Sequence, residues 1–108
     1  MPEQKITPCF RIADLQQLKK QSPDQVTIID VRNPEEYAAK HISGAINIPL
    51  GELENRSNEL SKQSLIITVC GKGGGRSAAA AEKLKQQGFT KAIFLCGGTF
   101  GWYDTIKQ

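Results

Sequence analysis

The chain has 108 residues, of which 39% are hydrophobic and 23% are charged, and its net charge is +3. This length suffices for one domain with a single core, and the composition excludes a disordered chain. The small, scattered basic excess does not indicate nucleic-acid binding. The sequence has neither an apolar run long enough to span a bilayer nor an N-terminal secretory signal. We therefore expect one cytoplasmic domain covering residues 1–108, with no nucleic-acid or membrane partner.

Strand and helix patterns alternate along the chain. In chain order, they predict a strand at 6–10, a helix at 12–20, a strand at 26–31, a helix from 34 towards 41, a strand at 45–48, short helical turns within 50–60, a strand at 65–69, a helix at 77–87, a strand at 92–95 and a helix at 99–106. Asn33 is expected to cap the start of the helix at 34, and Gly88 is expected to end the helix at 77–87. Alternation of this kind predicts an α/β fold with a mainly parallel sheet.

The segment from Leu65 to Ala81 combines a strand, a cysteine, a glycine-rich loop and a helix start. Its glycines permit positive φ angles, so the backbone can curl and its N–H groups can form an anion-binding nest. The helix dipole and Arg76 add positive potential, and Ser77 is a good N-cap candidate. Because this field favours the thiolate, Cys70 is predicted to be a nucleophile whose loop also holds an anion. The predicted substrate-binding residues are Gly71, Lys72, Gly73, Gly74, Gly75, Arg76 and Ser77.

Two other interpretations of this segment are a structural cysteine and a loop that binds a nucleotide phosphate. The letters GKGGGRS have neither the spacing nor the Lys-Ser/Thr ending of a P-loop, and they match the dinucleotide fingerprint poorly. The three cysteines, Cys9, Cys70 and Cys96, show no metal-binding spacing. An odd cysteine count without a signal peptide predicts reduced thiols, and we expect no metal and no cofactor.

Five stretches of the chain together resemble the single-domain rhodanese family. They are IIDVR at 28–32, PEEY at 34–37, HISGAINIP at 41–49, the strand and cysteine loop at 65–77, and LCGGTFGW at 95–102. Each stretch alone is weak, but the ordered set covers nearly the whole chain. The resemblance implies a central parallel sheet of about five strands flanked by helices on both faces, with the Cys70 loop as the active site.

The resemblance also implies a sulfurtransferase that works through a persulfide on Cys70. The Cys70 thiolate would take the outer sulfur of a small anionic donor, thiosulfate or a persulfide. A thiophilic acceptor such as glutathione, cyanide or a protein thiol would then remove it, which predicts ping-pong kinetics. Lys72 and Arg76 are expected to attract the anionic end of the donor.

Other residues have expected roles around this site. Asp30 and Arg32 are expected to support it as an ion pair or through hydrogen bonds to neighbouring loops. In the rhodanese topology Cys96 lies on the strand beside that of Cys70, so it could act as a resolving thiol; the alternative is a half-buried small residue. Cys9 is expected to be incidental, His41 to bond backbone, and the aromatic residues Phe100 and Trp102 to belong to the core or the pocket wall.

One feature departs from the family pattern. Five residues separate Cys70 from Arg76, one more than in the common rhodanese loop. This spacing resembles that of same-fold cell-cycle phosphatases and arsenate reductases, whose larger loop accepts a tetrahedral oxyanion. Those enzymes usually carry a histidine where this chain has Val69. Phosphatase or arsenate reductase activity therefore stays an alternative, as does a non-catalytic interaction module, which the presence of Cys70 makes less expected.

Overall fold

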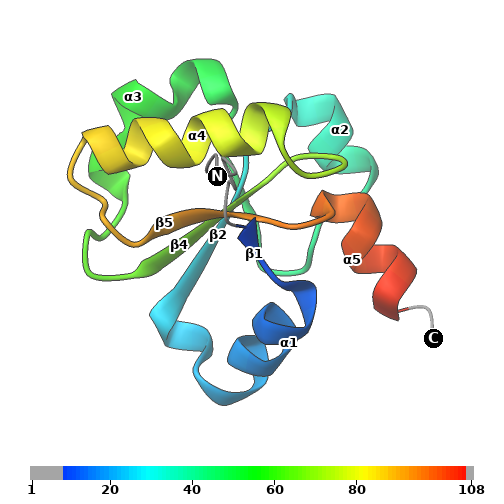
Figure 1. The fold of residues 1–108 in the computed structure, drawn as a ribbon. Helices are drawn as coiled ribbons and strands as arrows, with labels where there is room; N and C mark the ends of the chain where they lie inside the picture. Colours follow the sequence, from blue (N-terminus) through cyan, green and yellow to red (C-terminus); the bar gives the residue numbers. More distant parts are fainter. Residues whose placement is uncertain (1–8, 107–108) are drawn as a thin grey trace, which may run out of the picture.

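The computed structural model describes residues 9–106 and shows a five-stranded sheet between two layers of helices (Figure 1). All strands are parallel, in the order β1-β5-β4-β2-β3. The strands are β1 (Cys9–Phe10), β2 (Val26–Asp30), β3 (Ile46–Asn47), β4 (Leu65–Val69) and β5 (Ala92–Leu95). The helices are α1 (Ile12–Gln21), α2 (Pro34–Ala39), α3 (Leu53–Arg56), α4 (Gly75–Gln86) and α5 (Gly98–Ile106), with 3-10 turns at Pro23–Gln25, Leu50–Glu52 and Ser57–Glu59. The predicted α/β class with helices on both faces is confirmed.

The core consists of two clusters, one on each face of the sheet. Successive residues of β4 point to opposite faces: Ile66 joins the cluster beneath α3 and α4, and Ile67 joins the cluster beneath α1 and α5. Both side chains are fully buried. A strand that is covered on both faces presents neither face to solvent, which explains why β4 is apolar apart from Thr68, whose buried hydroxyl donates to the carbonyl of Ser77. None of the helices within residues 9–106 has the length and apolarity needed to cross a bilayer.

The start of α4 corrects one prediction. The helix begins at Gly75 with Gly74 as its N-cap, so Ser77 is not the N-cap but the third residue of the helix. Gly74 has a φ of 92° and Gly75 a φ of 45°, backbone conformations that a side chain disfavours. Because these glycines adopt positive φ angles, the helix begins two residues before Ser77, the residue that the sequence indicated as its cap. At the other end, Gly88 has a φ of 99° and ends the helix as predicted.

The start of α2 confirms the predicted cap at Asn33. The backbone N–H of Glu36 donates to Asn33 Oδ1 at 3.0 Å, and the backbone N–H of Asn33 donates to Glu36 Oε1 at 3.2 Å. Pro34 occupies the first position of the helix, where no N–H donor is needed. The remaining predicted boundaries lie close to the observed ones, and residues 6–8 of the first predicted strand fall outside the described residues.

A disulfide joins Cys9 to Cys96. This bond overturns three expectations: that all the cysteines are reduced, that Cys9 is incidental, and that Cys96 is available as a resolving thiol. The reason is the strand order, because β1 pairs with β5 and the N–H of Cys96 donates to the carbonyl of Phe10, the residue that follows Cys9. Two cysteines 87 positions apart thereby lie side by side, and Cys70 is the free cysteine of the chain.

Candidate active site

Cys70 directly follows β4, so it lies at the carboxyl edge of the sheet. In Figure 1 this edge is on the right-hand side, where α4 and α5 begin. This is the edge at which α/β sheets collect their ligands. The residue is 6% exposed, and it lies at a hollow of about 500 Å³. The hollow is lined by Glu36, Cys70, Gly71, Lys72, Gly73, Gly74, Gly75, Arg76 and Phe100.

The Cys70 sulfur contacts two oxygen atoms. Sγ lies 3.2 Å from the carbonyl oxygen of Gly74 and 3.2 Å from Oγ of Ser77. A carbonyl can only accept, so the first contact is donated by the protonated thiol. Within the described loop the sulfur is thus hydrogen-bonded by a carbonyl and a hydroxyl, whereas the sequence led us to expect a nest of N–H groups.

The Ser77 hydroxyl is placed to serve the anionic form of the sulfur. Oγ is buried, lies 3.0 Å from the carbonyl oxygen of Gly74, and accepts from the N–H of Gly74 at 3.2 Å. A hydroxyl can rotate its proton from the carbonyl towards a sulfur anion. The carbonyl of Gly74 would keep its helix bond from the N–H of Ser77 at 3.0 Å, so the rotation leaves no acceptor unpaired.

The first turn of α5 holds the start of the loop, a contact that the sequence did not reveal. The N–H of Thr99 donates to the carbonyl of Cys70 at 2.8 Å, and the N–H of Phe100 donates to the carbonyl of Gly71 at 2.9 Å. These bonds use donors that would otherwise stay unpaired at the helix start. They orient two loop peptides with their carbonyls towards α5 and, since the peptides are trans, their N–H groups away from it.

Gly98 is predicted to be essential for this contact. It has a φ of +62°, and a Cβ there would overlap the carbonyl oxygen of Cys70 and approach that of Gly71 at 2.7 Å. We expect Gly98→Ala to lower the free energy of unfolding by about 1–3 kcal/mol, the usual effect of overpacking, and to slow alkylation of Cys70. Gly51→Ala is the control, because a Cβ at that position meets nothing within 4 Å. Urea unfolding and iodoacetamide kinetics measure both effects, and equal behaviour of the two variants would contradict the prediction.

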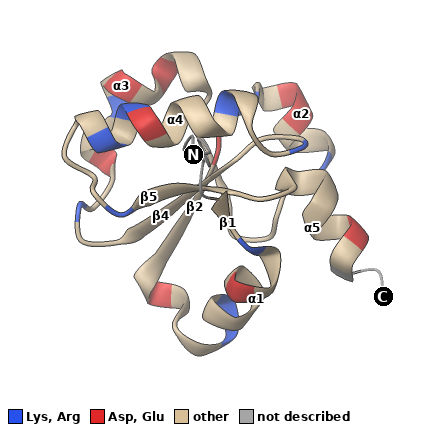
Figure 2. Ribbon diagram, viewed as in Figure 1, with Lys and Arg blue, Asp and Glu red and all other residues tan. Residues whose placement is uncertain are grey.

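The Arg76 guanidinium at the rim of the hollow is paired with a carboxylate. It donates to Glu36 Oε1 at 2.9 Å and to Oε2 at 3.3 Å. Figure 2 shows acidic residues on α2 and basic residues along α4, the helices that supply this pair. The hydrogen bond from Arg76 lowers the pKa of Glu36 and burial opposes it, while the same hydrogen bond raises the pKa of Arg76. The stabilising effect of the pair is therefore present above the ordinary carboxyl pKa of 4.5 and is lost as pH falls through the lowered value.

Asp30 and Arg32 form an ion pair, one of the two supporting arrangements that the sequence predicted. Their side chains are 0% and 3% exposed and meet at 2.9 Å. Arg32 also donates to the carbonyl of Lys40 at 2.6 Å, and Asn47 donates to the carbonyls of both Asp30 and Arg32 at 3.0 Å. The pair is absent from the residues that line the hollow, so it holds the surrounding chain in place and does not contact the reacting group.

The aromatic residues singled out in the sequence lie in two places, the wall of the hollow and the core. Phe100 is 48% exposed and lines the hollow, whereas Trp102 is buried in the core beneath α5. Nδ1 of His41 donates to the carbonyl of Tyr37 at 2.8 Å, which confirms the expected backbone bond. The sequence missed the contribution of Glu36 to the site, because its cap motif is local but its partner Arg76 lies 40 positions away.

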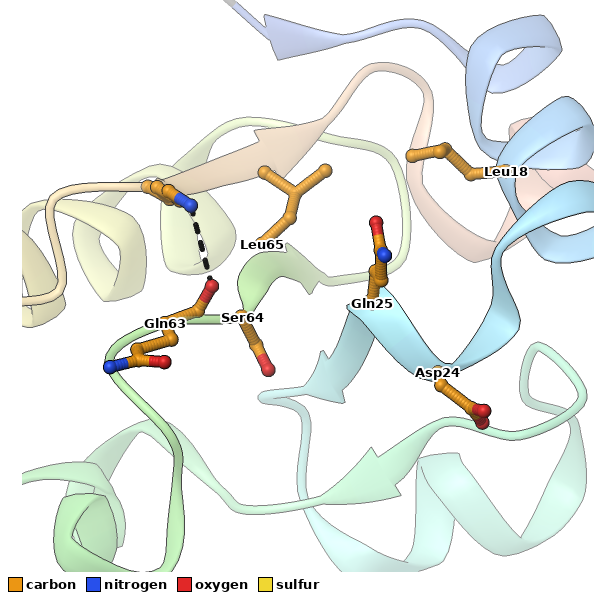
Figure 3. A pocket seen from close by; sticks show the side chains of 7 residues that line it. Leu18, Asp24, Gln25, Gln63, Ser64 and Leu65 are labelled. Atoms are coloured by element: carbon orange, nitrogen blue, oxygen red, sulfur yellow. Dashed lines mark hydrogen bonds between the residues drawn. The ribbon is translucent and has the colours of Figure 1, made fainter.

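A second hollow, of about 490 Å³, lies near the amino ends of β2 and β4 (Figure 3). Its lining includes Lys91, which donates to the carbonyl of Gln63 at 3.4 Å, and Asp24. Neither cysteine nor histidine is among its lining residues, which are Leu18, Asp24, Gln25, Gln63, Ser64, Leu65 and Lys91. The hollow at Cys70 is therefore the stronger candidate for chemistry.

Comparison with known proteins agrees with this geometry. The Rhodanese-like domain family matches residues 12–105. The chain is 44% identical over 84 residues to "Putative sulfur carrier protein YrkF" of Bacillus subtilis, covering 78% of this chain and 45% of that protein. It is 32% identical over 79 residues to "Sulfurtransferase" of Allochromatium vinosum, covering 73% of each.

A solved structure extends the comparison to three dimensions. A rhodanese-related protein from Thermoplasma volcanium superimposes with a TM-score of 0.78 at 33% identity, over 90% of this chain and 91% of that one. Several curated relatives are longer: the chain spans 45% of YrkF and 63% of YqhL, both from Bacillus subtilis. The family match, the shared fold and the cysteine loop at the carboxyl edge of the sheet lead to one conclusion: the chain belongs to the rhodanese-like domain family.

Proposed function

We propose that this domain is a sulfurtransferase that carries sulfane sulfur as a persulfide on Cys70. The observation that carries the proposal is the position of this free thiol, in a hollow at the carboxyl edge of the sheet and within 3.2 Å of a buried serine hydroxyl. Relatives named as a sulfurtransferase and a sulfur carrier support the same chemistry.

In the first half-reaction, the Cys70 thiolate attacks the outer sulfur of the donor. A sulfur–sulfur bond forms to Sγ while the sulfur–sulfur bond of the donor breaks, which releases sulfite from thiosulfate or a thiolate from an organic persulfide. The persulfide on Cys70 keeps the negative charge. The Ser77 hydroxyl, after rotating towards Sγ, stabilises the Cys70 thiolate that attacks the donor in this step and leaves in the next one.

In the second half-reaction, an acceptor thiolate attacks the outer sulfur of the Cys70 persulfide. The acceptor leaves as a persulfide and the Cys70 thiolate is regenerated, so both halves balance without an added oxidant or reductant. Glutathione, cyanide or a protein thiol can serve as the acceptor, with cyanide leaving as thiocyanate. The enzyme alternates between two covalent forms, which is the origin of the expected ping-pong kinetics.

Intact-mass spectrometry of the wild-type chain tests the proposal. Treatment with thiosulfate or an organic persulfide is expected to add about 32 Da, one sulfur atom held in a covalent intermediate. Subsequent cyanide should remove this mass as thiocyanate, and peptide mapping should place it on Cys70. The absence of a sulfur adduct with both donors would contradict the proposal.

The loop spacing supports a second candidate, a phosphatase or arsenate reductase, because five residues separate Cys70 from Arg76. p-Nitrophenyl phosphate hydrolysis and arsenate reduction are measured on the same preparation. Turnover of either substrate without a sulfur adduct would favour this second candidate. Inactivity in all of these assays would favour a non-catalytic interaction module.

A further inference from the structure

The salt bridge between Glu36 and Arg76 brings α2 and α4 together at the hollow beside Cys70. Both residues line this hollow. The two terminal nitrogens of Arg76 each donate to a different oxygen of Glu36, at 2.9 Å and 3.3 Å. Two parallel contacts of this kind are the geometry in which a guanidinium binds a carboxylate or a tetrahedral oxyanion. The Glu36 carboxylate therefore occupies the edge of the guanidinium formed by its two terminal nitrogens, one of the two edges at which Arg76 can bind an oxyanion through paired N–H groups.

Glu36 is held at this position independently of Arg76. Its backbone N–H and its carboxylate both bond to Asn33, so the start of α2 already directs the side chain. Its charge persists at neutral pH, because the hydrogen bond from Arg76 lowers the pKa of the carboxyl. An anion that approaches Arg76 must displace this carboxylate or bind beside it, and like charges at this distance repel each other.

The lining of the hollow also includes an aromatic ring, that of Phe100. Phe100 is 48% exposed, and its ring lies 3.2 Å from the position that a Cβ on Gly71 would take. Lys72 is the remaining cation among the lining residues, and it is exposed. A lining that offers one unpaired ammonium group and one aromatic ring suits an organic group better than a small inorganic dianion, since the dianion gains from paired donors.

We propose that Glu36 is a specificity-determining residue that disfavours inorganic tetrahedral dianions and selects organic persulfides as sulfur donors. The inference rests on the proposed sulfur transfer and names its donor class. Glu36 has two effects on an anionic donor. It occupies the guanidinium of Arg76, and its own negative charge at the rim of the hollow repels the donor. Thiosulfate, phosphate and arsenate all carry the multiply charged oxyanion that this arrangement disfavours, whereas an alkyl persulfide has no oxyanion and at most a single charge.

Alkylation of Cys70 tests the proposal without requiring sulfur transfer. Rates with neutral iodoacetamide and anionic iodoacetate are measured for the wild-type chain, Glu36→Gln and Glu35→Gln. Glutamine at position 36 can keep the bonds to Asn33, because Glu and Gln both serve in a capping box. Glu35→Gln removes the same charge from the adjacent exposed position. Glu36→Gln should raise the ratio of the iodoacetate rate to the iodoacetamide rate about fivefold, and Glu35→Gln by about twofold at most.

Turnover gives a second readout. Glu36→Gln is expected to lower the KM for thiosulfate about fivefold relative to the KM for an alkyl persulfide, whereas Glu35→Gln should leave both KM values unchanged. Equal alkylation ratios in the two variants, or an unchanged KM for thiosulfate, would overturn the assignment of Glu36. A wild-type chain that forms no sulfur adduct would instead overturn the proposed function, and the alkylation ratio would still decide whether Glu36 excludes anions.

Discussion

Cys70→Ser is expected to abolish the sulfur adduct and reduce sulfur transfer to the uncatalysed background. A serine hydroxyl is a far weaker nucleophile than a thiolate at neutral pH, and nothing in the hollow replaces the sulfur. The fold should persist, because the serine hydroxyl can make the same bonds to Gly74 and Ser77 that the thiol makes. Intact mass, thiocyanate formation and urea unfolding measure these three properties.

The other cysteines supply the internal control for this experiment. Cys9 and Cys96 form a disulfide, so a thiol reagent applied without reductant should find one reactive thiol per wild-type chain and none in Cys70→Ser. After unfolding and reduction the counts should rise to three and two. A sulfur adduct that survives the substitution would place the carrier elsewhere and contradict the assignment of Cys70.

Arg32→Met is expected to cause the largest loss of stability, about 3–5 kcal/mol, as when one partner of a buried pair is removed. Asp30 has no exposed surface and receives three side-chain bonds from Arg32, at 2.9, 3.0 and 3.3 Å. Methionine approximates the length of the side chain without its charge, so the buried carboxylate loses its partner. The consequence reaches the site, because Val31, between these two residues, donates to the carbonyl of Val69 next to Cys70.

Urea unfolding of Arg32→Met, compared with Arg56→Met, measures this loss. Arg56 also pairs with carboxylates, those of Glu52 and Glu59, but on the surface, where ion pairs contribute little. Adding Asp30→Asn to Arg32→Met removes the uncompensated charge and should recover part of the lost stability. Similar losses for Arg32→Met and Arg56→Met would contradict the explanation based on burial.

The features predicted correctly depend on residues close together in the chain. The strands at Leu65–Val69 and Ala92–Leu95 match their predicted bounds, because each is a short apolar run rich in strand-forming residues. The cap of α2 was predicted because Asn33 and Glu36 lie three positions apart. Two local predictions differed from the structure: glycines with positive φ competed with Ser77 for the helix start, and the sulfur of Cys70 contacts a carbonyl and a hydroxyl in place of loop N–H groups.

Three features could be predicted from the amino-acid sequence alone, because they follow from local chemistry. They are the glycine-rich loop, the position of Cys70 directly after a strand, and the alternation of strands with helices. The bond between Cys9 and Cys96, the pairing of Glu36 with Arg76 and the contact of α5 with the Cys70 loop could not be predicted. Each joins segments that are distant along the chain. They become neighbours only because the strands assemble in the order β1-β5-β4-β2-β3, and that order is set by how the two faces of the sheet are buried together.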